Sequence, residues 1–110
     1  MQFLFIVMFT VDMEIIHDFM EFMERIHFPD MHATGCFVGK PRKVLQSGEP
    51  NTFNLTYFHE LKSENEWKLY NDTFRAKLKK DFADNFGQFI ENGQLKAVST
   101  AGRVDEVLEV

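Results

Sequence analysis

The pattern of apolar and polar positions changes along the chain, and each change marks a predicted element. From Phe3 to Val11 nearly every residue is apolar, and a run of this length predicts a strand buried on both faces. Asp12 follows, a residue type that caps helices, and apolar side chains then recur at helical spacing. An amphipathic helix is therefore expected. Its apolar stripe consists of Ile15, Ile16, Phe19, Phe22, Met23 and Ile26.

Proline and glycine mark the next boundaries. Pro29 disfavours helical dihedrals at Phe28 and predicts the end of the first helix there. A short turn then runs from Pro29 to a left-handed exit at Gly35. Residues 36–45 predict a second strand that bends near Gly39, and the proline two positions later suits an edge strand.

The middle of the chain predicts a third strand and a second helix. Residues 52–60 alternate, with Tyr57 on the same face as Phe53 and Leu55. Ser63 and Glu66 have the spacing of a capping box, which predicts a helix start. Aromatic and leucine side chains then follow helical spacing until a glycine predicts the helix end. These positions are Trp67, Tyr70, Phe74, Leu78, Phe82 and the terminating Gly87.

The order of elements predicts the fold. A last strand is expected within residues 89–100, and a weakly structured tail from about residue 102. The order β-α-β-β-α-β is that of the ferredoxin-like fold, an α+β class, here as one domain over residues 1–110. Right-handed crossovers place both helices on one face of a four-stranded antiparallel sheet. The other face carries apolar residues of the first strand and Phe58, so we expect a second copy of the chain to cover it as a homodimer.

Composition excludes several classes of function. A net charge of −5 argues against nucleic-acid binding, and no Lys/Arg-Gly-aromatic string of an RNA-recognition motif occurs. The single cysteine, Cys36, precludes an intrachain disulfide and fits the reducing cytoplasm. No apolar run approaches the length of a membrane span. The 13 phenylalanines suit a core, an interface or an apolar pocket.

The candidate chemistry centres on the predicted end of the first helix. His27 falls in its last turn, where the helix dipole favours a cation, and Asp30 follows across the proline bend. A hydrogen bond between them would raise the basicity of His27, as a general base requires. Alternatively, the same two residues only cap the helix and the turn. Thr34 and Tyr57 are expected as secondary polar contacts of a ligand.

Other chemistry is less well supported. Trp67 and Tyr70 are expected to line an apolar pocket together with His27. His27, Asp30, His32 and His59 are of types that bind zinc or iron. Their spacing matches no established pattern, so no metal site is predicted, and no feature selects a cofactor. Cys36 is expected to serve packing.

The string His27-Phe28-Pro29-Asp30-Met31-His32-Ala33-Thr34-Gly35 carries a family resemblance. With the aromatic helix before it, it resembles a small bacterial family of unknown function whose motif is His-x-Pro-Asp-x-x-Ala-Thr-Gly. Tyr57-Phe58, Trp67-x-x-Tyr70 and Phe86-Gly87 also look alike. The resemblance implies membership of the dimeric α/β-barrel superfamily, whose members include cofactor-independent monooxygenases, isomerases and haem-degrading proteins.

Two functional hypotheses follow. The first is a homodimeric protein that binds or transforms a small apolar molecule in a pocket near His27. The alternative is a non-catalytic dimeric interaction or regulatory module. A closed apolar cavity beside His27 distinguishes the two, because a ligand-binding protein needs one, whereas a fully packed interior favours the interaction module.

Overall fold

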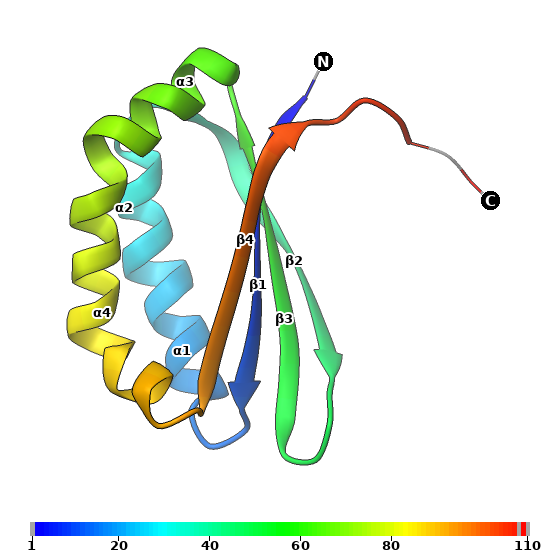
Figure 1. Ribbon diagram of the computed structural model, residues 1–110, viewed down its shortest axis with the longest axis vertical. Helices are drawn as coiled ribbons and strands as arrows, with labels where there is room; N and C mark the ends of the chain where they lie inside the picture. Colours follow the sequence, from blue (N-terminus) through cyan, green and yellow to red (C-terminus); the bar gives the residue numbers. More distant parts are fainter. Residues whose placement is uncertain (1, 108, 110) are drawn as a thin grey trace.

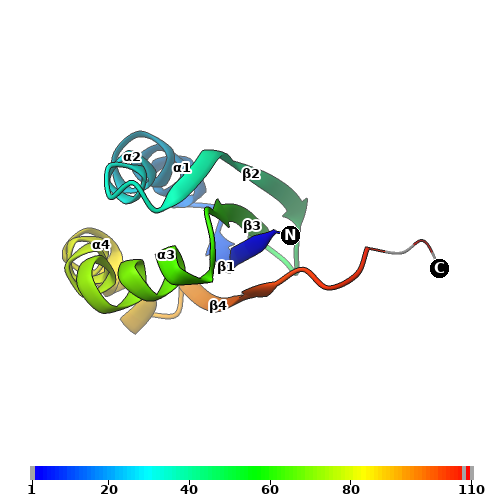
Figure 2. The same cartoon turned by 90° about the horizontal axis from the view of Figure 1, so that it is seen from above.

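A four-stranded antiparallel sheet carries two helical segments on one face, which is the predicted ferredoxin-like arrangement (Figures 1 and 2). The computed structural model describes residues 2–107 and 109. The strands lie in the order β2-β3-β1-β4. Their bounds are β1 Phe3–Asp12, β2 Phe37–Ser47, β3 Thr52–Leu61 and β4 Leu95–Arg103.

The central strand β1 has one buried face. Phe5 and Phe9 point toward the helices and are buried, whereas Leu4 and Ile6 on the opposite face are half-buried and Met8 is 47% exposed. The prediction that both faces are buried is therefore wrong for a single chain, because the helices cover only one of them. The uncovered apolar face remains open.

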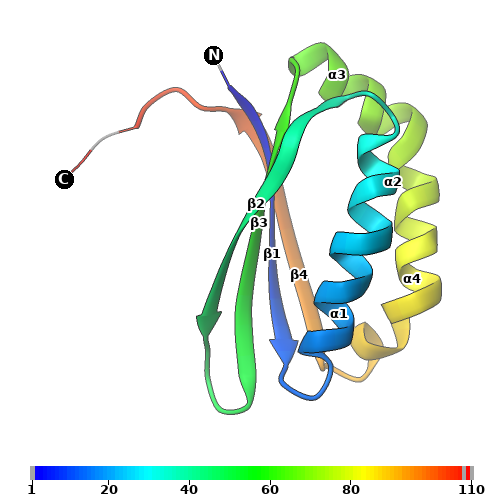
Figure 3. The same ribbon diagram turned by 180° about the vertical axis from the view of Figure 1, so that it is seen from behind.

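The first helical segment runs past Pro29 without a break (Figure 3). It consists of α1 (Ile16–Phe22), a π turn (Met23–His27) and α2 (Phe28–His32). The predicted end at Phe28 is wrong, since Phe28 is helical and its N–H donates to the Met23 carbonyl five residues back. The π turn widens the helix just before Pro29. In a regular α-helix the proline ring would clash with the carbonyl group four residues earlier.

The π turn also corrects the predicted apolar stripe. An extra residue in the turn rotates every later position, so Ile26 is 53% exposed while Phe28 and Met31 are buried. Asp12 does not cap α1 itself. Its carboxylate accepts a hydrogen bond from the Glu14 N–H at 2.8 Å, within the turn before the helix.

The second helical segment has the same construction. It comprises α3 (Glu64–Leu69), a π turn (Tyr70–Phe74) and α4 (Arg75–Glu91). The predicted capping by Ser63 is confirmed, because its side chain accepts the Glu66 N–H at 3.4 Å. The predicted end at Gly87 is wrong: the helix continues to Glu91, and Gly93 with φ +84° follows it. Residues 89–91 are accordingly helical, and the last strand begins at Leu95.

The predicted edge strand and its bend are confirmed. β2 lies at the sheet edge, with a bulge between Val38 and Arg42 and a φ of +63° at Gly39. Gly35 has the predicted left-handed conformation, with φ +78°. β4 reaches Arg103, and residues 104–107 leave the sheet on the side of its open face (Figure 1). Residues 108 and 110 of the predicted tail lie outside the described residues.

Gly87→Ala should stabilise the protein by about 0.5–1 kcal/mol, because glycine inside a helix is entropically unfavourable. The new Cβ would lie 3.7 Å from the Ala83 Cβ, an ordinary contact. Gly35→Ala is the matched control: it meets no neighbour but must adopt φ +78°, which costs about 1 kcal/mol. Urea unfolding measures both changes. Destabilisation by Gly87→Ala would contradict the helix assignment.

Candidate functional site

A cavity of about 210 Å³ lies between the sheet and the two helical segments. Its interior is mostly apolar, and the exposed residues Lys79, Ala97 and Ser99 among its lining place its mouth between α4 and β4. The side chains of His27, His59, Tyr70 and Arg75 also line it. The apolar lining includes Phe5, Phe9, Phe28, Met31, Leu78 and Phe82. This pocket beside His27 is open between α4 and β4, so it is neither the closed cavity of the first hypothesis nor the fully packed interior of the second.

His59 is the most unusual residue of the cavity. It is 1% exposed, and neither ring nitrogen has a hydrogen-bond partner in the described part of the chain. Aromatic rings surround it, with Phe28 at 4.6 Å and Phe5 at 5.9 Å between ring centroids. Burial, with smaller contributions from His32 and His27, lowers the pKa of His59 to about 3. The imidazole is therefore neutral at physiological pH, with one donor and one acceptor unused.

His27 lies in the wall of the cavity but not at a helix end. Because α2 continues to His32, the predicted position of His27 in a last helical turn is wrong. Its ring packs against Phe22 and Phe82, at centroid distances of 6.0 and 5.8 Å. Burial lowers the pKa of His27, while the charges of Asp30 and Asp81 oppose the shift. His27 is thus a neutral imidazole facing the cavity.

Asp30 and Thr34 lie away from the cavity. Asp30 is exposed, and among residues 2–107 no hydrogen bond joins it to His27; its charge only opposes the lowering of the pKa of His27 by burial. The Thr34 hydroxyl donates to the Met31 carbonyl at 2.6 Å and accepts from the Cys36 N–H at 3.3 Å. These bonds close the turn after α2. Cys36 itself is buried.

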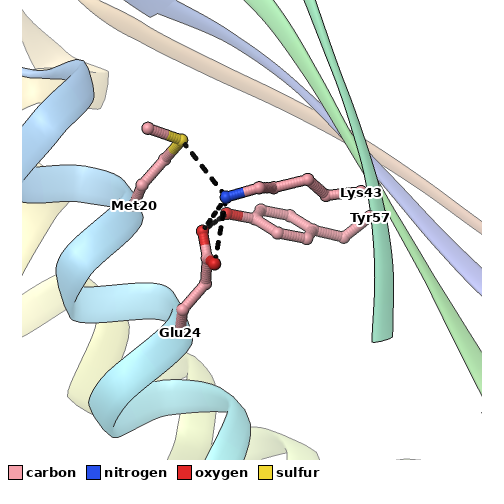
Figure 4. A network of polar contacts seen from close by, with 4 residues as sticks. All are labelled: Met20, Glu24, Lys43 and Tyr57. Carbon is pink, nitrogen blue, oxygen red and sulfur yellow. Dashed lines mark hydrogen bonds and ion pairs between the residues drawn. The ribbon is translucent and has the colours of Figure 1, made fainter. Parts of the chain in front are cut away.

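Tyr57 belongs to a polar network that attaches the first helical segment to the sheet (Figure 4). Its hydroxyl donates to a Glu24 carboxylate oxygen at 2.9 Å, and Lys43 Nζ lies 2.9 and 3.0 Å from the two oxygens. Lys43 Nζ also lies 3.9 Å from the Met20 sulfur. Burial, together with the Glu24 carboxylate, raises the pKa of Tyr57. Its hydroxyl is therefore already used and does not line the cavity.

Of the two aromatic residues expected in the pocket, Tyr70 lines it and Trp67 does not. Burial raises the pKa of Tyr70 to about 12, so its phenol stays neutral. Trp67 packs on Phe5 with 5.1 Å between ring centroids. The Arg75 guanidinium lies over both rings, 5.2 Å from the Phe5 centroid and 5.5 Å from the Trp67 centroid. Trp67 therefore positions Arg75 at the cavity.

His32 lies near His59, but the two do not form a metal site. The ring centroids are 6.5 Å apart, and among the described residues His32 Nε2 is buried without a hydrogen-bond partner. Within residues 2–107 and 109, no three His, Cys, Asp or Glu side chains are grouped to hold a metal ion. In the same described part, no helix is long and apolar enough to cross a membrane.

Sequence reasoning underestimated His59. The available signal was a polar residue continuing the inward-facing series Phe53, Leu55 and Tyr57 of β3. A histidine in such a position is buried among apolar residues. The neighbours that leave it without a partner come from three other elements, which periodicity along one strand does not identify.

Solved structures place the chain in the ferredoxin-like class. A dimeric ferredoxin-like protein from an uncultured marine organism is 15% identical, with a TM-score of 0.65 over 97% of this chain and 98% of that one. A second such protein is 12% identical, with a TM-score of 0.53 over the whole of both chains. A monooxygenase from the ActVA-Orf6 gene of Streptomyces coelicolor, in complex with nanaomycin D, is 16% identical, with a TM-score of 0.56 over 98% and 93%.

Residues 2–92 match the model of the domain of unknown function DUF4286, so the chain belongs to this family. The expected membership of a family of unknown function is confirmed, while the nine-residue motif stays a prediction. No curated protein matches the chain.

The unpartnered His59 predicts a pH dependence of stability. Above pH 6.5 it is neutral in both folded and unfolded chains; below that, the unfolded chain takes up a proton that the folded one refuses until about pH 3. The free energy of unfolding should therefore fall as the pH falls through this window. The fall should be steeper in wild type than in His59→Phe, by about 1.4 kcal/mol per pH unit. Urea unfolding from pH 7 to 4 tests this. Parallel profiles would contradict the burial of a neutral His59.

Proposed function

We propose that this protein binds a small, mostly apolar molecule in the cavity between α4 and β4. The observation that carries the proposal is the cavity itself, which combines an apolar lining with polar groups at a few points, as ligand sites do. Apolar cavities of about 150 Å³ already accept a benzene ring. A volume of about 210 Å³ therefore suits a ligand of about one ring with its substituents.

If the ligand is transformed, His27 is the candidate catalytic residue. It faces the cavity as a neutral imidazole, the form that accepts a proton from a bound molecule. Asp30 then acts on His27 from outside the cavity only through its charge, which favours protonation of the imidazole. The monooxygenase neighbour with its bound ligand supports a ligand-binding use of this fold, although a fold alone does not define a reaction.

We also propose that the protein forms a homodimer through the open face of its sheet. Met8 on β1, Val44 on β2 and Val98 on β4 are 45–60% exposed there, in one row across the sheet that passes through Thr56 of β3. Two of the solved structures with this fold are dimeric ferredoxin-like proteins. An apolar face of this kind needs a cover, and a second copy supplies a matching one.

The buried free Cys36 supports a cytoplasmic location. A dimeric interaction module without a ligand remains the alternative.

Methionine methyl groups report directly on the cavity. In protein labelled at its methionine methyls, 4-methylphenol should shift the signals of Met23 and Met31, which line the cavity, in a saturable way. Met13 is 52% exposed elsewhere and serves as an internal control. Ala97→Trp at the mouth should abolish the shifts. Equal shifts at all three methionines, or none at Met23 and Met31, would contradict the proposal.

His27→Gln tests the role of His27 in the same experiment. Glutamine keeps hydrogen-bonding capacity but does not titrate near neutrality. Binding of 4-methylphenol should weaken several-fold, while Asp30→Ala should leave it within about twofold because Asp30 is outside the cavity. Unchanged binding in His27→Gln would make this residue structural.

Light scattering after size exclusion should give about twice 12.9 kDa for the wild-type chain. Met8→Glu should produce a monomer, because it places a charge in the centre of the open sheet face. Met13→Glu is the matched control, since Met13 is equally exposed but lies in the turn before α1. A monomeric wild type at micromolar concentration would contradict the homodimer.

A further inference from the structure

Two cations at the mouth of the cavity have no acidic partner. On α4, Lys77 pairs with Asp81 and Lys80 pairs with Asp84. Within the described residues, no carboxylate lies within ion-pair distance of the other two cations of this helix, Arg75 and Lys79, which lie on its cavity side and line the cavity.

The hydrogen bonds of Arg75 leave its charge uncompensated. Its guanidinium donates to the Asn71 side-chain oxygen at 3.0 Å and to the Ser99 hydroxyl at 3.2 Å, which are both neutral groups. Packing of the guanidinium over Phe5 and Trp67 holds it in place. In a chain of net charge −5, two adjacent unpaired cations at a pocket mouth favour an anionic group there.

The inner part of the cavity offers a second polar contact. His59 lines the cavity and is 1% exposed, and among the described residues both of its ring nitrogens are buried without a partner. A buried polar group without a partner destabilises the fold, and a hydrogen bond to a ligand hydroxyl or carbonyl would recover that loss. His59 lies on β3 and Ser99 on β4, with β1 between them. In register, His59 pairs with Phe5 and Ser99 with Val7, two residues further along β1. Two strand spacings across and two residues along separate them by roughly 12 Å, which one ring with a polar substituent at each end and its two hydrogen bonds spans.

We propose that the ligand is a small aromatic carboxylate that carries a hydroxyl or carbonyl group at the end opposite its carboxylate. The carboxylate lies at Arg75 and Lys79, the ring lies among Phe5, Phe28 and Leu78, and the distal oxygen bonds to His59. This assignment rests on the proposed function and specifies its ligand class.

Three probes separate the parts of the proposal. 4-Hydroxybenzoate carries both polar groups, its methyl ester lacks the charge, and benzoate lacks the hydroxyl. Affinities come from the Met23 and Met31 methyl shifts, at low and high salt. We expect 4-hydroxybenzoate to bind at least tenfold more tightly than its ester and several-fold more tightly than benzoate. Added salt should weaken the acids more than the ester.

Variants assign each contact. Lys79→Gln should weaken 4-hydroxybenzoate three- to tenfold and leave its ester unchanged, whereas Lys80→Gln, on the same helix but paired with Asp84, should change neither. His59→Phe should remove the advantage of 4-hydroxybenzoate over benzoate. If the ester binds as well as the acid, or Lys79→Gln has no effect, the carboxylate assignment is wrong while the cavity still binds ligands. If no probe shifts Met23 or Met31, both this inference and the proposed function fail.

Discussion

The packing of aromatic rings between β1 and the two helical segments determines both the fold and the cavity. Phe9 packs edge-on against Phe19 at 4.9 Å, and Phe19 packs against Phe86 at 5.2 Å, which ties the sheet to both helices. Toward the other end of the strand, Phe5 packs against Trp67 at 5.1 Å. Phe5, Phe9 and Phe82 of this layer also line the cavity, so the rings that hold the helices on the sheet are the ones that shape the site.

The sequence predicted the elements whose signals are local. Alternation in β3, the Ser63 capping box and the edge strand with its bulge are all confirmed, because each depends on neighbours along the chain. Pro29 and Gly87 misled the prediction for the opposite reason. A π turn accommodates the proline, and the packing of Phe86 against Phe19 keeps α4 helical through the glycine. Tertiary contacts outweigh such local preferences, and sequence periodicity does not contain them.

The candidate site shows the same division. Proximity in sequence favoured His27 with Asp30, yet only His27 lines the cavity, and the exposed Asp30 acts on it through charge alone. Tyr57 and Thr34 are polar residues whose hydrogen bonds are used within the fold. His59 joins the site only through its neighbours on other elements, which enclose it without offering a partner. The residue types identified which polar side chains a site could use. Only the fold identifies which of them have no hydrogen-bond partner within the protein and are therefore available to a ligand.

The alternation of β1 separates the two surfaces on which the proposals depend. Phe5 and Phe9 face the cavity, and Met8 between them in sequence faces the open side. A dimer formed on the open side would leave the mouth between α4 and β4 accessible, because that mouth lies on the helix side of the sheet. The strand is nevertheless shared, so contacts that hold its outer face also hold the rings that shape the cavity. Pairing of two sheets would thus make the cavity more rigid without closing it, which lowers the entropic cost of binding a ligand there.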